Sequence, residues 1–310
     1  MIELFARSSG MREAVRLAER VSSTGANVLI TGESGSGKDL LAAYIHWKSP
    51  RAAQVLVKID CATVPEGLLE AELFGYERGA FTGATETKPG RFEAAQNGTL
   101  ILDEIAHLPI DAQAKLLRVI ETHEFERLGG RHTIRIDLRL IALTNVDLAA
   151  AVKTGRFRED LFYRLDVIHI RVPPLRERKE DLSQLIQHFL RHYAAKHGRK
   201  VERVSAPAMA VLRSYDYPGN ARELANIIER AVIVANGKRL EENDLPPGLN
   251  AAVNARRQKE KPPSLAELEA SYIAEVLAST NGNKTECARI LGISRKNLYE
   301  KIARYDLSHG

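Results

Sequence analysis

A glycine-rich turn between an apolar strand and a helix constrains this 310-residue chain more than any other feature. The segment reads VLITGESGSGKDLLAAYI over residues 28–45. Its glycines allow backbone N–H groups to close around phosphate oxygens, and the following helix adds partial positive charge at its N-terminus. A lysine after the last glycine would reach the β- and γ-phosphates. Spacing alone also fits an ordinary loop-to-helix turn. The residues predicted to bind nucleotide are Gly32, Glu33, Ser34, Gly35, Ser36, Gly37, Lys38, Asp39 and Leu40.

The first half of the chain alternates short apolar runs with helical patterns. Such alternation predicts an α/β fold with a mainly parallel five-stranded sheet covered on both faces. A hairpin-like piece at 131–138 is read as an insertion before the fourth run. The five expected strands are 28–31, 55–60, 99–104, 139–145 and 167–172.

Strand patterns stop after residue 172, and residues 180–236 read as helices. A proline-rich, charged stretch then indicates a linker. Ser264 and Glu267 form a capping box that opens another helix, through about residue 280. We therefore expect four parts: a nucleotide-binding α/β core at 1–172, a helical lid at 173–240, a linker at 241–263 and an all-α domain at 264–310.

Two carboxylates end the third apolar run, TLILDEI. Burying them is costly unless they meet a cation or a polar ligand. Asp103 suits a Mg²⁺ ligand, with Asp39 as a second candidate, and Glu104 suits polarising an attacking water. The alternative is a strand that runs into a solvated loop. Asn145, at the end of the next strand, could contact the γ-phosphate or that water.

Phosphoryl transfer also needs cations facing the leaving charge. The segment GRFREDLFYRLDV offers Arg156, Arg158 and Arg164. Arg158 and Arg164 are six residues apart and do not share a helical stripe, so surface salt bridges to nearby acidic residues are an equally good reading.

Composition excludes several classes of protein. The two cysteines, Cys61 and Cys287, form neither a disulfide framework nor a zinc spacing, which favours a reducing cytoplasm. No apolar run reaches about 18 residues, and the N-terminus lacks a signal-peptide core, so we expect no membrane segment.

The C-terminal segment 283–307 has helix-turn-helix spacing, with Ala288 at the helix contact and Gly292 at the turn. Residues 284–304 hold six basic and two acidic side chains, a net +4, as expected of a double-stranded DNA contact. A bland helical hairpin is the alternative. The expected apolar seam is Ile290, Leu291, Ile293, Leu298 and Ile302, and the candidate DNA-binding residues are Arg295, Lys296, Asn297, Tyr299 and Lys301.

The segment GYERGAFTGA (75–84) is too rich in glycine for a good helix or strand, yet it carries an aromatic side chain expected to meet water. Phe81 could instead be a core residue of a tight turn.

Together these motifs resemble the bacterial sigma-54-dependent transcriptional activators, a family of AAA+ ATPases, over residues 8–307. The most specific match is the intact hexapeptide GAFTGA at 79–84. GESGSGKD resembles the Walker A motif of the family, LILDEI its Walker B and ALTN its sensor I. FREDLFYRL resembles its arginine-finger segment, YPGNARELANIIERA its sensor II, and the C-terminal segment its Fis-type DNA-binding domain.

The resemblance implies a P-loop NTPase that uses ATP and Mg²⁺, with Arg158 and Arg164 as fingers acting in trans and Arg222 as the lid arginine. The active unit would be a homo-oligomeric ring, most simply a hexamer assembled from dimers. The loop 79–84 would grip sigma-54 in the RNA polymerase holoenzyme, and 126–132 would move with it. The partner-binding residues implied are Gly79, Ala80, Phe81, Thr82, Gly83 and Ala84.

Two positions depart from the family pattern. Asp39 stands where Glu is usual, and Asp60 stands where an Asn commonly holds the catalytic glutamate away from the water. Two carboxylates cannot share that hydrogen bond unless one is protonated or a bridge intervenes. Asp60 is therefore the expected nucleotide-sensing switch, with an altered hydrogen-bonding mode.

The leading hypothesis is an ATP-driven remodeller of sigma-54 RNA polymerase, tethered to upstream DNA. One alternative is a DNA-binding regulator whose AAA+ fold only senses a ligand or nucleotide. Another is a non-transcriptional DNA motor or loader. The chain begins at the ATPase domain, so regulation is expected from a separate partner or from a sensory domain outside this sequence.

Overall fold

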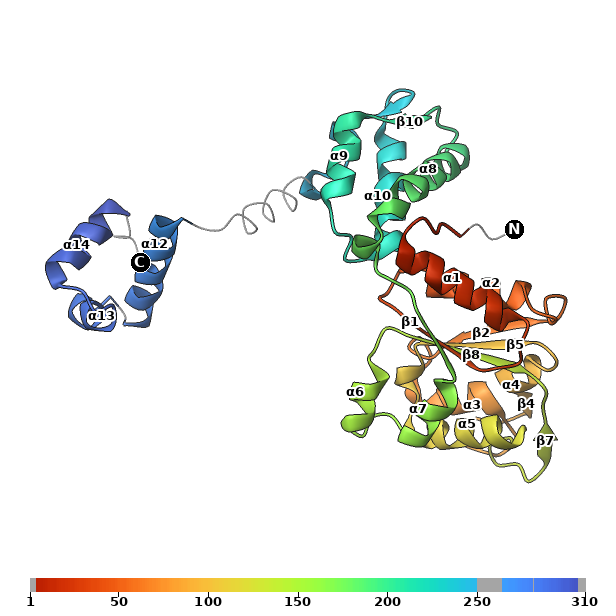
Figure 1. Cartoon of the computed structure of the whole chain (residues 1–310). Helices are drawn as coiled ribbons and strands as arrows, with labels where there is room; N and C mark the ends of the chain where they lie inside the picture. Colours follow the sequence, from red (N-terminus) through yellow and green to blue (C-terminus); the bar gives the residue numbers. More distant parts are fainter. Residues whose placement is uncertain (1–3, 250–263, 281, 306–310) are drawn as a thin grey trace. The chain divides into compact units, whose positions relative to one another are not determined.

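The computed structural model describes residues 4–249, 264–280 and 282–305 (Figure 1). The chain divides into two compact units, 1–249 and 250–310, and each is described by itself. No helix in the described ranges is long and apolar enough to cross a membrane.

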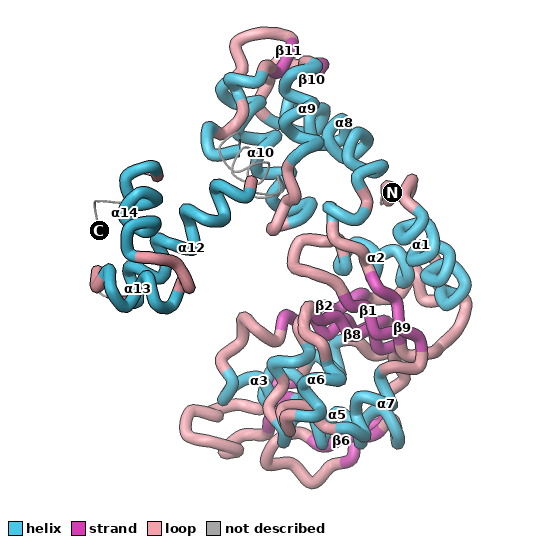
Figure 2. The backbone as a smooth tube through the Cα atoms, turned by 60° about the vertical axis from the view of Figure 1, so that its left-hand side comes forward, coloured by secondary structure: helices cyan, strands magenta, loops and turns pink. Residues whose placement is uncertain are grey.

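A five-stranded sheet forms the centre of the first unit (Figure 2). All its pairings are parallel, in the order β2-β5-β8-β1-β9, which confirms the predicted sheet. Four of the strands, β1, β2, β5 and β8, end at or just before a residue assigned to the site from sequence, so the carboxyl edge of the sheet carries these residues. The strands are β1 (Val28–Thr31), β2 (Leu56–Asp60), β5 (Thr99–Asp103), β8 (Arg139–Thr144) and β9 (Ile168–Arg171).

Helices cover both faces of this sheet, as Figure 1 shows. Because side chains alternate along a strand, Val28 and Ile30 pack with α1 (Ser9–Ser22) and α2 (Lys38–Trp47), whereas Leu29 belongs to the core on the other face. Burial on both faces explains why these strands read as continuous apolar runs. The helices that supply the second face are α3 (Glu66–Phe74), α4 (Arg91–Ala94), α5 (Ile110–Thr122), α6 (Leu148–Lys153) and α7 (Glu159–Leu165).

Two short antiparallel pairs project from the core. β3 (Gly75–Tyr76) pairs with β4 (Lys88–Pro89), and the loop between them contains GAFTGA. The expected insertion at 131–138 is a hairpin whose second strand, β7 (Thr133–Arg135), pairs with β6 (Glu124–Glu126).

The lid is built from α8 (Lys179–Lys196), α9 (Ala206–Ser214) and α10 (Asn220–Val234). Two expectations are corrected here. Strands do not stop after residue 172, because β10 (Arg203–Val204) and β11 (Arg239–Leu240) form a parallel pair too short to show a pattern. The lid also does not end at 240: Leu245 and Leu249, four residues apart, are buried in its core. The rest of the expected linker lies outside the described residues.

The second unit contains α12 (Leu265–Ser279), α13 (Lys284–Ile290) and α14 (Arg295–Arg304). Asn283 and Ser294 cap α13 and α14 through their side chains, and Gly292 takes a φ of 66° in the turn between them. The expected seam is wrong at Ile290, which is 48% exposed, because the buried positions of α13 are Cys287 and Ala288.

Candidate nucleotide site and protein-contact loop

The phosphate loop joins β1 to α2 as the sequence predicts. Gly37 is the N-cap of α2 with a φ of 103°, and a Cβ added there would meet nothing within 4 Å. The loop therefore opens toward free space at the helix N-terminus. Ser36 is buried, and its Oγ is without a hydrogen-bond partner among the described residues. A buried hydroxyl of this kind fits a ligand that brings its own acceptors.

Lys38 is only 6% exposed and folds back over the loop. Its Nζ donates to the carbonyl of Gly32 at 2.8 Å and lies 3.8 Å from Glu104 Oε1. An ammonium held by carbonyl oxygens can turn toward a phosphate because those carbonyls are weak partners compared with an anion.

Glu104 follows β5 in a left-handed conformation, with a φ of 51°. Its backbone N–H donates to Asp103 Oδ1 at 3.0 Å, and its Oε2 accepts from the backbone N–H of Asn145 at 3.2 Å. Such a conformation is strained for a non-glycine residue. It turns the Glu104 side chain away from the strand and toward Lys38.

Lys58, on β2, was missed by the sequence analysis. Its Nζ lies 2.8 Å from Asp103 Oδ2 and also pairs with Asp39. Burial alone would lower the pKa of this ammonium, but hydrogen bonds to Asp103 and Asp39 outweigh burial and raise it. The two carboxylates predicted to hold Mg²⁺ thus already converge on one cation, so their chemistry fits a metal ion. In the described ranges, no group of three or more His, Cys, Asp or Glu side chains is placed to hold a metal ion.

Asp60 is paired in register with Asp103 across β2 and β5. Its carboxylate accepts from the backbone N–H of Ala62 at 3.0 Å and caps its own turn. Glu104 instead accepts from the Asn145 backbone.

The lid docks directly on the phosphate loop. Arg222 donates to Ser34 Oγ at 3.0 Å, and the N–H of Ala221 donates to the Gly35 carbonyl at 3.0 Å. Asn220, fully buried, donates to the Ser34 carbonyl at 3.0 Å and accepts from the N–H of Leu175 at 2.7 Å.

Glu33 joins the same contact from the phosphate loop. It accepts two hydrogen bonds from Arg176, one of them at 2.8 Å, and one from Asn220 at 3.1 Å. The hydrogen bonds from Arg176 and then Asn220 lower the pKa of Glu33 to about 2. The lid is therefore fastened to this loop by an ion pair as well as by backbone contacts.

Two adjacent cavities lie at this junction. A cavity of about 280 Å³ is lined by phosphate-loop residues together with Asp103, Glu104 and Arg222. A smaller one of about 140 Å³ shares Gly37 and Leu40 with it and is mostly apolar. The N-terminal segment and α8 line the smaller cavity with side chains that no sequence motif marks: Leu4, Phe5, His188 and Phe189.

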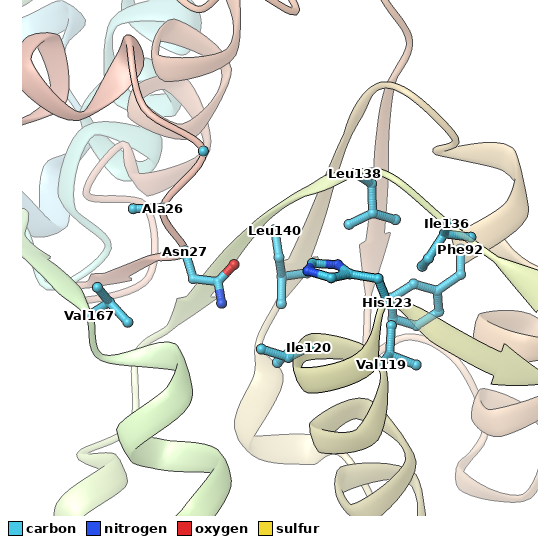
Figure 3. A pocket seen from close by; sticks show the side chains of 11 residues that line it. Ala26, Asn27, Phe92, Val119, Ile120, His123, Ile136, Leu138, Leu140 and Val167 are labelled. Atoms are coloured by element: carbon cyan, nitrogen blue, oxygen red, sulfur yellow. The ribbon is translucent and has the colours of Figure 1, made fainter.

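A further cavity of about 280 Å³ lies at the amino edge of the sheet, where β1, β8 and β9 begin (Figure 3). Mostly apolar side chains line it, and His123 and Asn27 are the polar groups that Figure 3 labels there. It contains none of the predicted site residues.

Arg158 and Arg164 do not line the nucleotide cavity. Arg158 pairs with Asp160 at 2.8 Å and Arg164 with Glu121 at 3.1 Å, both on the surface near α7. The salt bridges expected from sequence are thus present, although Arg164 pairs with Glu121, which is distant from it in the sequence. Gln113, a fully buried residue that the sequence analysis missed, accepts from the backbone N–H of Arg158 at 2.8 Å and fixes the start of α7.

The loop 79–84 is closed by its own backbone. Gly79 donates to the Ala84 carbonyl at 2.8 Å, and Phe81 at the tip is 37% exposed, with its ring edge-on to Tyr76 at 5.0 Å between centroids. Phe81 is therefore not a core residue. Gly129 packs so closely on Ala80 that an added Cβ would lie 2.9 Å from the Ala80 Cβ, so the loop and 126–132 touch.

In the second unit, Arg295, Lys296, Asn297 and Tyr299 are exposed on α14. Lys301 is only partly exposed and forms an ion pair with Glu269 of α12 at 2.6 Å. Lys301 thus braces two helices, a role that the sequence analysis did not foresee.

Family models match three consecutive stretches of the chain. Residues 4–171 match the sigma-54 interaction domain, 176–262 the AAA+ ATPase lid domain, and 264–305 the bacterial regulatory protein domain of the Fis family.

Named relatives agree with these matches. The chain is 46% identical over 312 residues to the regulatory protein AtoC of Escherichia coli (strain K12), covering 98% of the chain and 68% of AtoC. It is 44% identical over 311 residues to the nitrogen fixation protein VnfA of Azotobacter vinelandii, covering 99% of the chain and 59% of VnfA. A crystal structure of NtrX from Brucella abortus in complex with ADP has a TM-score of 0.75 at 32% identity, covering 98% of this chain and 70% of that one. On these matches, the chain belongs to the sigma-54-dependent transcriptional regulators, with an AAA+ ATP-binding domain, its lid and a Fis-type helix-turn-helix domain.

Proposed function

We propose that this protein hydrolyses ATP and uses the energy to remodel the sigma-54 RNA polymerase closed complex. Phosphates would enter the cavity at the phosphate loop, where the N-terminus of α2 and the Lys38 ammonium favour negative charge. The base would lie in the adjacent apolar cavity beside Phe5 and Phe189. NtrX, at 34% identity, has also been solved in complex with ATP, which supports this assignment.

Each residue of the site has a distinct role in this proposal. Glu104 orients and polarises the attacking water, and Asn145 holds the Glu104 carboxylate through its backbone N–H. Arg222 carries positive charge from the lid to the phosphates. Asp60 is retained as the switch proposed from the sequence, acting through the turn that it caps rather than through direct contact with Glu104.

Mg²⁺ would be held by Asp103, with Asp39 as a second ligand, and when bound it neutralises phosphate charge. The convergence of the two carboxylates on one cation is the feature that supports this placement.

The exposed tip of the loop 79–84 is the observation that carries the proposed remodelling function. Phe81 offers an aromatic anchor for a protein contact, and the matched domain is described as a sigma-54 interaction domain. β2 ends beside Asp103, and α3 leads from there to Gly75 at the base of the loop. One helix therefore separates the nucleotide site from the proposed grip on sigma-54.

The position of the arginines supports a ring of subunits, which we propose is a hexamer built from dimers. Arg158 and Arg164 do not line the cavity of their own chain, so they would act on a neighbour. Mixing Glu104→Gln and Arg158→Ala subunits tests this: each variant alone should be inactive, and the mixture should recover ATPase activity. A mixture that stays inactive while it assembles would refute action in trans.

The second unit would bind upstream double-stranded DNA through α14. Its first turn carries Arg295 and Lys296. Cations are disfavoured there, because the N-terminus is the positive end of the helix dipole. An anionic partner such as a DNA phosphate would offset this repulsion. Leu265, Leu268 and Tyr272, all at least half exposed on α12, would pair two copies on a palindromic site. We also keep the four-part division of the chain as a proposal, with the lid extended to 249.

The first experiment is co-elution of the protein with purified sigma-54, with and without ADP plus a metal-fluoride phosphate mimic. We expect a complex only with the transition-state mimic. ATPase activity and ring assembly without any complex would leave a DNA-binding ATPase with a different target.

Substituting the loop separates the leading function from its alternatives. Phe81→Ala or Thr82→Ala should keep most ATPase activity and abolish transcription activation. Survival of activation in both variants would remove the loop from the mechanism and favour a regulator or DNA motor that acts without it.

A further inference from the structure

Lys58 occupies the place between the two proposed metal ligands. Its Nζ contacts Asp103 Oδ2 at 2.8 Å and Asp39 Oδ1, so the two carboxylates lie at most about 6 Å apart, twice an ordinary hydrogen-bond length. Asp103 is the more buried of the two, with 12% of its side chain exposed against 46% for Asp39. Without a cation between them, these carboxylates would repel each other.

The Lys58 side chain is also able to leave. It is 41% exposed, and a lysine stem can carry its ammonium into solvent while staying on the protein surface. Lys38 differs, because only 7% of its side chain is exposed and its ammonium is held by loop carbonyls. Of these two lysines, Lys58 is therefore the one whose ammonium is free to move away from the carboxylates.

We propose that Lys58 is a tethered cation that holds Asp39 and Asp103 together in the nucleotide-free protein and gives way when Mg²⁺ enters with the nucleotide. This inference rests on the proposed function, since it concerns the same metal site. Lys58 is a positioning residue here. It keeps the carboxylates preorganised and lowers the affinity for a metal ion that arrives without phosphate oxygens, because one positive charge opposes another.

Titration with Mn²⁺ in the absence of nucleotide, followed by the electron paramagnetic resonance of the free ion, tests the proposal on the full chain. Wild type should bind Mn²⁺ weakly. Lys58→Met should bind it about tenfold more tightly, a modest value chosen because solvent screens a half-exposed charge. Lys58→Arg, which keeps the charge, should stay weak, and the Lys58→Met/Asp39→Asn double variant should lose the gain.

Lys196→Met is the matched control, because Lys196 pairs with Glu229 at 2.8 Å with a similarly exposed side chain outside this site. It should bind Mn²⁺ as wild type does. Equal affinity in wild type and a folded Lys58→Met, or an equal gain in Lys196→Met, would overturn the proposal.

Lys58→Gln provides a second neutral variant. Should both neutral variants unfold, Mn²⁺ should restore the folded circular-dichroism spectrum, and failure to restore it would also overturn the proposal. The titration contains neither nucleotide nor sigma-54, so its result is independent of the co-elution experiment that tests the proposed function.

Discussion

Replacing Gly35 with alanine should destabilise the nucleotide-free protein more than the same change at Gly37 of the same loop, because only Gly35 packs against the lid. Gly35 has a φ of +72°, and a Cβ there would lie 2.4 Å from the carbonyl oxygen of Gly219 in the lid. Contacts under 3.0 Å are essentially never seen, so that carbonyl would have to retreat by at least 0.6 Å. The hydrogen bond from Ala221 to Gly35 would stretch with it.

The magnitude follows from three contributions. A left-handed conformation costs an alanine about 1–2 kcal/mol, overpacking about 1–3 kcal/mol, and a lost hydrogen bond about 1 kcal/mol. Gly35→Ala should therefore lower the free energy of unfolding by about 3–6 kcal/mol. Gly37→Ala is the control, because Gly37 also has a positive φ, +103°, but open space around it. It should cost only about 1–2 kcal/mol.

Urea unfolding without nucleotide, followed by the fluorescence of Trp47, measures this difference. Trp47 is the one tryptophan of the chain and ends α2, the helix that follows the phosphate loop. Equal destabilisation by the two substitutions would show that the lid does not press on Gly35, and the lid contact argued above would be wrong.

Three further predictions concern other parts of the chain. The pKa of Glu33 falls from 4.5 to about 2 on folding, so its contribution to stability is present above pH 4.5 and lost as the pH falls through 2. Between pH 4.5 and 2, the unfolding midpoint of Glu33→Gln should therefore fall less steeply than that of the wild type, and equal slopes for the two proteins would refute this. Glu104→Gln should bind ATP in equilibrium dialysis but not hydrolyse it; substantial turnover would move the catalytic role elsewhere. Lys296→Met should weaken DNA binding on every sequence and reduce the salt slope by about 1, whereas Lys301→Met should mainly lower the melting temperature; the reverse pattern would reject these assignments.

Local chemistry made much of the fold predictable. The strands of the main sheet are apolar because both sheet faces are covered, and the phosphate loop is marked by glycines whose backbone needs a positive φ. Asp103 and Glu104 stand out because carboxylates at the end of a buried strand require a partner. Each of these signals lies within one short segment.

The features missed are those that join distant segments. Lys58 looks like an ordinary charge on a strand until β2 and β5 align it with Asp103. Gln113 acts on a backbone N–H forty-five residues away, at Arg158. Leu245 falls in the stretch that the sequence predicts to be a linker, because nearby prolines mask its i, i+4 spacing with Leu249. That spacing matters only against the lid core. No local pattern encodes such pairings.

The hold on Glu104 has a consequence for mutational genetics. Asn145 restrains that carboxylate with its main-chain N–H, and every amino acid except proline supplies the same donor. Alanine scanning would therefore leave the restraint intact and report only on the Asn145 amide group. If substitutions at position 145 are tolerated in such a screen, this does not show whether Glu104 needs to be restrained. Only a substitution by proline, which removes the donor, would test that.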